Sequence, residues 1–268
     1  MPILHIVVLA LVQGITEFLP VSSSGHLALV PILADWPDQG LIIDVAVHVG
    51  TLGAVMLYFW RDMVGMIAGL YRTAKGRSDP MARLAGLLAI STVPVVVAGY
   101  FLNRYGMDGL RSVTIIGWAT LGFGIILLIT DRIGMTLRRI EHVGFGDALI
   151  IGMAQVLALI PGTSRSGITM SAARLLGMER TEAARFSMLM SVPTIIGAGV
   201  LKGLELYQIG DARLTSDVIL AAGLSFVAAL VAIFLMMAWL RRATFTPFVV
   251  YRVLLGGGLL ALSYGWLG

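Results

Sequence analysis

The chain has 268 residues, of which 58% are hydrophobic and 13% are charged, and its mean hydropathy is +0.92. This balance excludes an ordinary soluble protein and indicates an integral membrane protein. The formal net charge is +4, and the absence of cysteine excludes disulfides and thiolate metal sites. Because the Lys and Arg residues fall between apolar segments, lipid and membrane topology explain them better than nucleic acid, and no nucleic-acid partner is expected.

Residues 1–34 are apolar but are interrupted near their middle, where Pro20 is followed by the serines Ser22–Ser24. Irregular backbone of this kind is tolerated at membrane depth only where it is buried in protein or lines a wet cavity. We therefore predict a re-entrant hairpin, a pair of short helices that returns to the side it entered. Residues 146–177 are broken in the same way, so a second re-entrant hairpin is expected there.

Six further stretches are apolar and long enough to cross a bilayer, which takes about 20 residues. They lie at 41–60, 82–102, 112–130, 184–203, 217–240 and 247–266. Three crossings follow each hairpin, and because three is odd, the second half begins on the opposite side of the membrane. We therefore predict an all-α integral membrane protein with one domain over 1–268, built as an inverted repeat with halves of about 1–130 and 140–268.

Internal similarity supports this repeat, because Gln13 to Gly25 and Gln155 to Gly167 have the same spacing. We expect the two hairpins to enter from opposite faces and to meet near the midplane, as broken helices do in inverted-repeat transporters.

The charge of the connections predicts the orientation, since cytoplasmic connections carry an excess of Lys and Arg. The basic connections hold Arg61, Arg72, Lys75, Arg77, Arg83, Arg132, Arg138, Arg139, Arg180, Arg185, Arg241 and Arg242. The opposite connections are poorer in positive charge, with Arg104, Arg111 and Arg213. Both termini and the mouth of the first hairpin are therefore expected outside the cytoplasm.

Glu17 is the only carboxylate in a long apolar stretch, and its i, i+4 spacing from Gln13 puts both side chains on one helix face. Because an intramembrane carboxylate is costly, we expect a catalytic or metal-binding role, with a hydrogen-bonded lock between helices as the structural alternative. Ser22, Ser23 and Ser24 exceed what one helix cap requires, and a helix N-terminus also binds anionic oxygens.

His26 lies one turn into the predicted second helix. A serine near Glu17 and His26 supplies the parts of an activated nucleophile, namely a hydroxyl, a base and a proton donor for the leaving oxygen. A hydrogen-bonded structural role for His26 stays open. His48 lies within a predicted crossing and is expected to be a packing or pore histidine.

The second polar run reads PGTSRSG at 161–167. Arg165 presents a planar fork of donors that matches phosphate oxygens, which predicts a phosphate clamp. Hydroxyl contacts at the start of the following helix can come from Ser164, Ser166 and Thr169. An intramembrane ion pair with Glu17 is the structural alternative, and it is compatible with phosphate binding. Arg174, nine residues on, is assigned to the cytoplasmic interface.

These two runs, QGITEFLPVSSSGH at 13–26 and PGTSRSG at 161–167, resemble the signatures of bacterial undecaprenyl-diphosphate phosphatases, the bacitracin-resistance family. The resemblance covers nearly the whole chain. It implies a multi-pass enzyme of the bacterial inner membrane that hydrolyses undecaprenyl diphosphate to undecaprenyl phosphate, recycling the carrier lipid for cell-wall synthesis. It also implies a divalent cation, Mg²⁺ or Ca²⁺, and an active site open to the periplasmic side.

The resemblance assigns roles residue by residue. Ser23 stands at the nucleophile, Glu17 at an acidic residue that also serves the metal, His26 at the histidine and Arg165 at the phosphate-binding arginine. The expected substrate-binding residues are Gln13, Ser22, Ser24, Ser164, Ser166 and Thr169. Gln13 falls where the family has Glu or Gln, and because an amide is neither base nor charge, Glu17 is the sole intramembrane acid of the first motif. A direct attack by water fits the sequence as well as a serine nucleophile does.

The alternative function is a secondary transporter or flippase of a phosphorylated lipid or an anion, since inverted repeats with broken helices are the architecture of carriers. Asymmetry favours the enzyme, because Glu17 and His26 are replaced in the second motif by Leu159 and Ile168. The expected partners are a polyprenyl diphosphate lipid and the membrane. The sequence leaves the oligomeric state open, with a homodimer among the choices.

Overall fold

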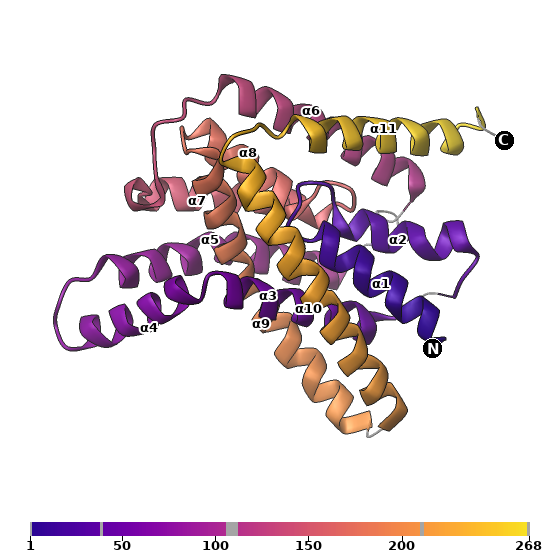
Figure 1. Cartoon of the computed structure of the whole chain (residues 1–268), viewed down its shortest axis with the longest axis horizontal. Helices are drawn as coiled ribbons and strands as arrows, with labels where there is room; N and C mark the ends of the chain where they lie inside the picture. The colour runs from indigo at the N-terminus through magenta and orange to yellow at the C-terminus, as the bar shows by residue number, and fades with distance from the viewer. Residues whose placement is uncertain (1, 38–39, 106–111, 210–211, 267–268) are drawn as a thin grey trace.

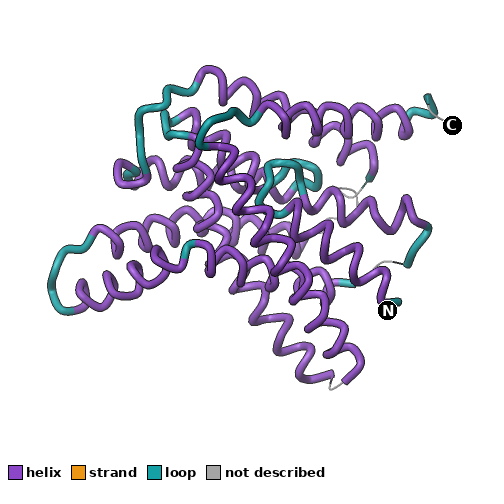
Figure 2. The backbone as a smooth tube through the Cα atoms, viewed as in Figure 1, coloured by secondary structure: helices purple, strands orange, loops and turns teal. Residues whose placement is uncertain are grey.

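The computed structural model describes residues 2–37, 40–105, 112–209 and 212–266 (Figure 1). Within these ranges the regular structure is helical (Figure 2), apart from one isolated bridge between Arg138 and Met178. The first half contains α1 (Ile3–Thr16), α2 (Ser23–Ala34), α3 (Leu41–Tyr58), α4 (Trp60–Ala74), α5 (Pro80–Tyr105) and α6 (Val113–Ile133). The second half contains η2 (Ile140–His142), α7 (Phe145–Val156), η3 (Leu157–Leu159), α8 (Arg165–Leu175), α9 (Arg180–Ile209), α10 (Ala212–Leu240) and α11 (Thr246–Ser263). The predicted all-α fold class is confirmed.

Both predicted hairpins are pairs of short helices joined by a turn. In the first, α1 ends at Thr16 and α2 begins at Ser23, with Pro20 in the turn between them. In the second, α7 and the short η3 lead through a turn at 160–164 to α8. Each hairpin packs its first helix on the opposite half, since α1 contacts α10 and α7 contacts α5. This reciprocal packing agrees with the predicted repeat, whose inverted orientation in the membrane stays a prediction.

A helix lies at each of the six predicted crossings. Within the described residues, α5, α6, α10 and α11 are long and apolar enough to span a membrane, and a fifth span results if the bent pair α3 and α4 counts as one. The expected crossing at 184–203 lies in α9, for which the side chains of 198–209 are outside the described residues. The chain is therefore a multi-pass membrane protein.

Helix α4 was not expected from the sequence, which predicts a basic connection after residue 60. The chain instead bends by 80° between α3 and α4 and continues as a helix beside α5 (Figure 1). Gly76, with a φ of +80°, follows the end of α4. Asp79 then starts α5, because its Oδ1 accepts the N–H groups of Met81 and Ala82 at 2.9 and 3.3 Å. Arg72 also donates to Asp79, at 2.6 Å. The hydrogen bonds from Arg72 and from the two amides hold the pKa of the Asp79 carboxyl below its usual value.

The basic connections gather at one end of the molecule. Arg83 donates to the carbonyl of Val143 at 2.9 Å, and Arg185 forms an ion pair with Asp62 of α4. These contacts join connections that are far apart in the sequence, as a common membrane face requires. Arg111 and the side chain of Arg213, on the predicted opposite face, lie outside the described residues. Which face is cytoplasmic stays a prediction.

Arg174, assigned from the sequence to the cytoplasmic interface, lies against the basic connection that follows α6, and its depth in the membrane stays a prediction. It is fully buried at the end of α8, where it donates to Asp131 at 3.2 Å and to the carbonyl of Gly134 at 2.9 Å. Arg180 binds the same Asp131 oxygen at 2.7 Å. Because α8 has 11 residues and starts inside the protein, its second end is still covered by α6 and α9.

Two glycines allow the hairpins to approach the opposite half closely. A Cβ at Gly14 of α1 would lie 2.5 Å from the Cβ of Ala228 on α10. A Cβ at Gly152 of α7 would lie 2.4 Å from the carbonyl oxygen of Ser91 on α5. Both distances are too short for real contacts. Each glycine therefore lets its helix approach the neighbouring helix more closely than a residue with a Cβ would.

We expect Gly152→Ala to destabilise the protein by about 1–3 kcal/mol, because the new methyl group overlaps a backbone atom that cannot move alone. Gly146→Ala on the same helix is the matched control, since a Cβ there meets nothing within 4 Å. That control should stabilise the helix by about 0.5–1 kcal/mol. Thermal unfolding in detergent measures both, and equal midpoints for the two variants would contradict the packing.

Candidate functional site

The two sequence motifs form the same local structure twice. Ser22 precedes α2 with a φ of 77°, and Ser164 precedes α8 with a φ of 72°. Each serine hydroxyl accepts the N–H of the glycine three residues on, Gly25 at 3.3 Å and Gly167 at 3.1 Å. A non-glycine residue in this conformation costs about 1–3 kcal/mol, which the surrounding structure must offset. As a result, Ser23 and Arg165 are each the first residue of a short helix.

The turns of the two hairpins touch one another, as expected from the sequence. Ser166 donates to the carbonyl of Leu19 at 2.9 Å, which links the second hairpin to the first. The fully buried Arg252 of α11 links them again, since it donates to the carbonyls of Pro20, Gly162 and Thr163 at 3.3, 2.9 and 2.8 Å. The N-termini of α2 and α8 therefore belong to one site.

No functional role was predicted for Arg252, although the signal was present. It is an arginine within an apolar helix, and a charge at such a position is costly unless protein groups satisfy it. Its partners are backbone carbonyls, including that of Thr120 on α6 at 3.0 Å, and among the described residues it forms no ion pair.

Glu17 lies at the centre of the site and is 6% exposed. Its Oε1 accepts Arg165 at 2.9 Å, so the ion pair foreseen as one alternative is present. Its Oε2 accepts the hydroxyl of Ser23 at 2.6 Å and the amide of Gln13 at 2.9 Å. Both motifs thus meet at a single carboxylate.

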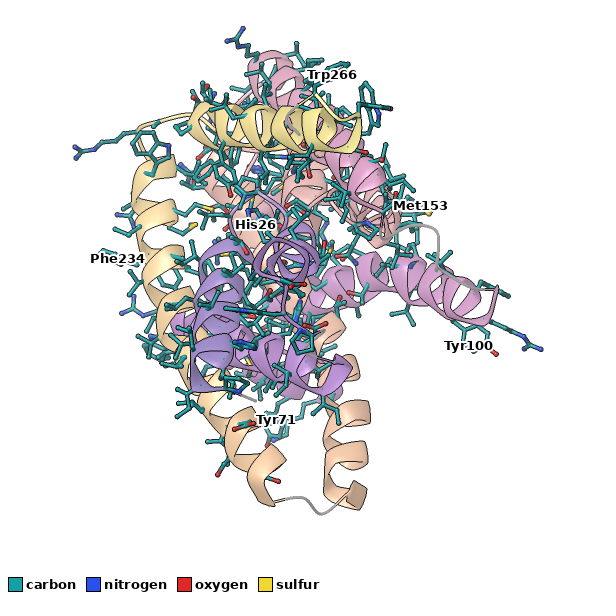
Figure 3. All side chains as sticks on the ribbon, turned by 90° about the vertical axis from the view of Figure 1, so that its right-hand side faces the viewer. His26, Tyr71, Tyr100, Met153, Phe234 and Trp266 are labelled. Atoms are coloured by element: carbon teal, nitrogen blue, oxygen red, sulfur yellow. The ribbon has the colours of Figure 1, made fainter. Side chains whose placement is uncertain are left out.

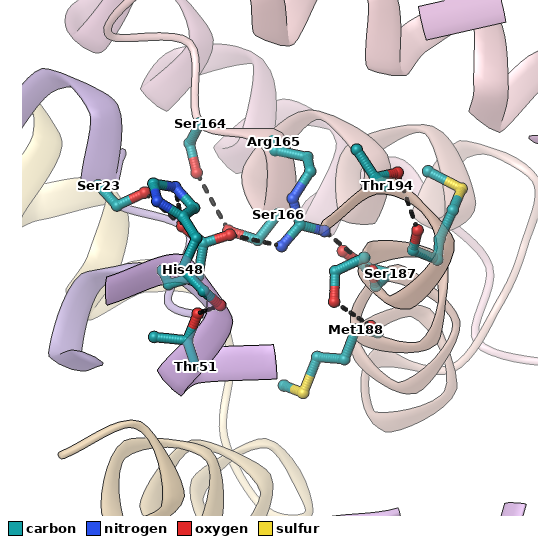
Figure 4. A network of polar contacts seen from close by, with 12 residues as sticks. Ser23, His48, Thr51, Ser164, Arg165, Ser166, Ser187, Met188 and Thr194 are labelled. Atoms are coloured by element: carbon teal, nitrogen blue, oxygen red, sulfur yellow. Dashed lines mark hydrogen bonds and ion pairs between the residues drawn. The ribbon is translucent and has the colours of Figure 1, made fainter. Parts of the chain in front are cut away.

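Arg165 is also held from the other side by α9. Its second guanidinium nitrogen donates to the carbonyl of Ser187 at 3.1 Å (Figure 4). Thr169 supports this arrangement, because its hydroxyl lies 2.6 Å from that of Ser187 and donates to the carbonyl of Arg165 at 2.8 Å. The guanidinium is therefore oriented before any ligand arrives.

A cavity of about 360 Å³ opens beside this network. Five predicted site residues line it: Glu17, Ser23, Ser24, Ser164 and Arg165. The other predicted residues, Gln13, Ser22, His26, Ser166 and Thr169, are not among its lining residues. Further lining residues that the sequence did not single out for the site are Asp44, Val45, His48, Val95, Gln155, Ala158, Leu159, Thr194 and Ile195. We call the polar and charged lining residues the polar wall, and Val45, Val95, Ala158, Leu159 and Ile195 the apolar wall.

A second cavity, of about 470 Å³, lies between α1, α10 and α11. It is lined by Ile15, Leu19, Ala228, Val231, Ala232, Leu235, Met236, Trp239, Pro247 and Phe248. None of its described lining residues is titratable, whereas the smaller polar cavity holds residues of both motifs and is therefore the candidate site.

Of the two histidines near the site, His48 lines the cavity and His26 is not among its lining residues. His26, which Figure 3 labels, donates from Nδ1 to the carbonyl of Ser22 at 2.6 Å, and its Nε2 meets Tyr251 of α11 at 2.5 Å. His48 instead lines the cavity, with its Nε2 3.6 Å from Glu17 and its Nδ1 donating to the carbonyl of Asp44 at 2.6 Å. The sequence signal that could have identified His48 as a cavity residue was the presence of a histidine within an apolar helix.

The residues were tested for a fit to a divalent cation. Across the described residues, no three His, Asp or Glu side chains gather as a metal site. Mg²⁺ in enzymes is often held by one or two carboxylates, with substrate phosphates and water as the remaining ligands. Glu17 and Asp44 both line the cavity, so the set fits a cation shared with a phosphorylated ligand rather than a cage made by protein alone.

We expect Arg165→Ala to destabilise the protein by about 3–5 kcal/mol, because it leaves the Glu17 carboxylate buried without its cation. Adding Glu17→Gln to the same chain should recover part of that loss, since no charge then remains to be satisfied. Unfolding of the single and double variants in mixed detergent micelles measures the coupling. Purely additive losses would mean that the ion pair contributes nothing.

Known proteins resemble this chain along nearly its full length. The family model for bacitracin resistance protein BacA matches residues 6–258. Undecaprenyl-diphosphatase 1 of Rhodospirillum rubrum is 55% identical over 98% of this chain and 96% of its own length. Proteins named undecaprenyl-diphosphatase from Ruegeria pomeroyi and Hahella chejuensis are 53% and 49% identical, covering 98% and 97% of this chain and 100% and 98% of their own lengths. The chain therefore belongs to the family of the bacitracin resistance protein BacA.

Proposed function

We propose that this protein removes the terminal phosphate of undecaprenyl diphosphate, producing undecaprenyl phosphate and inorganic phosphate. The names of its relatives supply the substrate. The observation that carries the chemistry is the continuous contact from Ser23 to Glu17 at 2.6 Å and from Glu17 to Arg165 at 2.9 Å. The hydroxyl, the carboxylate and the guanidinium line one cavity, which supports their roles as nucleophile, base and phosphate-binding cation.

Substrate binding follows from the two walls of the cavity. Arg165 turns from Glu17 to the terminal phosphate, and the free N–H groups at the starts of α2 and α8 add positive potential at the same point. Val95, Leu159 and Ile195 of the apolar wall accept the beginning of the polyprenyl chain. Positioning and charge neutralisation then supply most of the rate acceleration, as phosphoryl transfer requires.

In the first step, Glu17 takes the proton of Ser23, and the serine oxygen attacks the terminal phosphorus. A bond forms between that oxygen and phosphorus, while the anhydride bond breaks and its electron pair leaves on undecaprenyl phosphate. Glu17 passes its proton to solvent through the cavity. It then takes a proton from water, which attacks the phosphoserine, and returns that proton to Ser23 as phosphate leaves.

The proposal includes a divalent cation, Mg²⁺ or Ca²⁺, which the two carboxylates that line the cavity, Glu17 and Asp44, would hold. When bound, the cation neutralises charge on the diphosphate. The fit with a shared cation and the two lining carboxylates support this part of the proposal.

The proposed location is the bacterial inner membrane, with the cavity open to the periplasmic side. The gathering of basic connections at one end of the molecule supports this orientation, because such connections remain cytoplasmic. The homodimer stays a prediction.

The alternative, a transporter or flippase, is less well supported by the cavity. Only one of the two hairpins brings an acidic residue to it, since Leu159 stands at the position equivalent to Glu17.

The test is phosphate release from a polyprenyl diphosphate by purified protein in detergent, with Mg²⁺ or Ca²⁺ and with a chelator. We expect Ser23→Ala to lower the rate by about 10³-fold or more, as loss of a nucleophile does, and the chelator to abolish release reversibly. Ser171→Ala is the matched control, because Ser171 is a buried serine of α8 outside the cavity lining.

Folded wild-type protein that releases no phosphate would contradict the phosphatase and leave the transporter as the better candidate. Full activity of Ser23→Ala would contradict the serine nucleophile and point to direct attack by water.

A further inference from the structure

Gln155 is a buried polar residue that the reaction above does not use. It lies on α7, is 0% exposed, and lines the candidate cavity together with Ser164 and Arg165. Within the part of the chain that the structure describes, neither its amide nitrogen nor its amide oxygen has a hydrogen-bond partner. Burying an unpaired amide is costly, so groups of this kind are rare and call for an explanation.

The equivalent residue in the first hairpin shows what Gln155 lacks. Gln13 and Gln155 each lie ten residues before the first residue of a short helix, Ser23 and Arg165. The amide nitrogen of Gln13 donates to Glu17, four residues on. Four residues after Gln155 the chain has Leu159, which cannot accept a hydrogen bond. The second hairpin therefore has the amide without its internal acceptor.

The position of Gln155 in the cavity indicates what the acceptor is. One turn further along the chain, Ala158 and Leu159 line the cavity as part of its apolar wall. Ser164 and Arg165, which follow the turn, belong to the polar wall. Gln155 therefore belongs to a hairpin that contributes residues to both walls. In a diphosphate with its terminal phosphate at Ser23 and its chain on the apolar wall, the lipid-linked phosphate lies between these two sets of residues, and Gln155 offers it an unpaired donor.

We propose that Gln155 binds the lipid-linked phosphate of the substrate, the one that remains on the product, by donating its amide N–H to a phosphate oxygen. The inference rests on the proposed function for the direction of the substrate. The terminal torsion of glutamine is broad, so the amide turns toward the cavity with the rest of the side chain in place. An uncharged donor also suits a phosphate that must leave, since it holds the product less tightly than a second arginine would.

Gln155→Met tests the proposal, because methionine has a similar shape but no amide. Affinity for a polyprenyl monophosphate should fall about tenfold or more, the loss expected for one hydrogen bond to a charged group. The KM for the diphosphate should rise by a similar factor with little change in kcat. The ligand-free midpoint of thermal unfolding should stay equal or rise, because an unpaired buried amide has been removed. A purely structural glutamine would lower that midpoint instead.

Leu157→Met is the matched control, since Leu157 lies beside the same helix end, is 41% exposed and does not line the cavity. It should change neither affinity nor midpoint. Unchanged monophosphate affinity in Gln155→Met would overturn the inference. A loss of affinity confined to inorganic phosphate would overturn it too, because it would place the amide at the terminal phosphate.

Direct binding separates this inference from the proposed function. Wild-type protein that hydrolyses the diphosphate while Gln155→Met binds monophosphate normally would contradict only the role of Gln155. Wild-type protein that binds monophosphate through Gln155 but hydrolyses nothing would support the role of Gln155 and contradict only the phosphatase.

Discussion

Two helix-breaking turns meet inside this membrane protein, and their carbonyl groups must find donors there because lipid offers none. Arg252 meets this requirement with one side chain. Its planar fork reaches the carbonyls of Pro20 in the first turn and of Gly162 and Thr163 in the second, and it also binds carbonyls of α6. A lysine has no such fork and could not serve both turns at once. Because the turns are fixed, the helix starts at Ser23 and Arg165 face the same cavity.

The pairing of Glu17 with Arg165 solves a second problem, which is the presence of two charges at depth in an apolar protein. Each charge neutralises the other in the ligand-free site, and Ser23, Gln13 and Ser187 satisfy further donors and acceptors. In the proposed reaction, a phosphate that binds Arg165 competes with this ion pair for the same guanidinium. The two hairpins share a local structure but differ in charge, since the first carries Glu17 and the second carries Arg165.

The sequence predicted those parts of the site that follow from the properties of one segment alone. A charge or a broken helix in an apolar stretch is costly, and this rule located both hairpins, Glu17 and Arg165. Other parts depend on which distant segments meet, and one chain without its fold does not show this. His48 and Gln155 line the cavity because α3 and α7 meet there, and the contact of His26 with Tyr251 depends on the distant α11. The full burial of Arg174 likewise depends on Asp131 of α6, which the residues of α8 alone do not indicate.

The order of the helices has a consequence for how the protein is made. Helix α1 packs on α10, and the two turns are tied by a residue of α11, so the earliest segments of the chain find their partners among the latest. Contacts of such long sequence separation form slowly. During synthesis from the N-terminus, the first hairpin therefore precedes the helix that completes the hydrogen bonds of its turn. Ser166 can link the two turns once α8 is present, but the second link, through Arg252, is complete only when the last helix arrives.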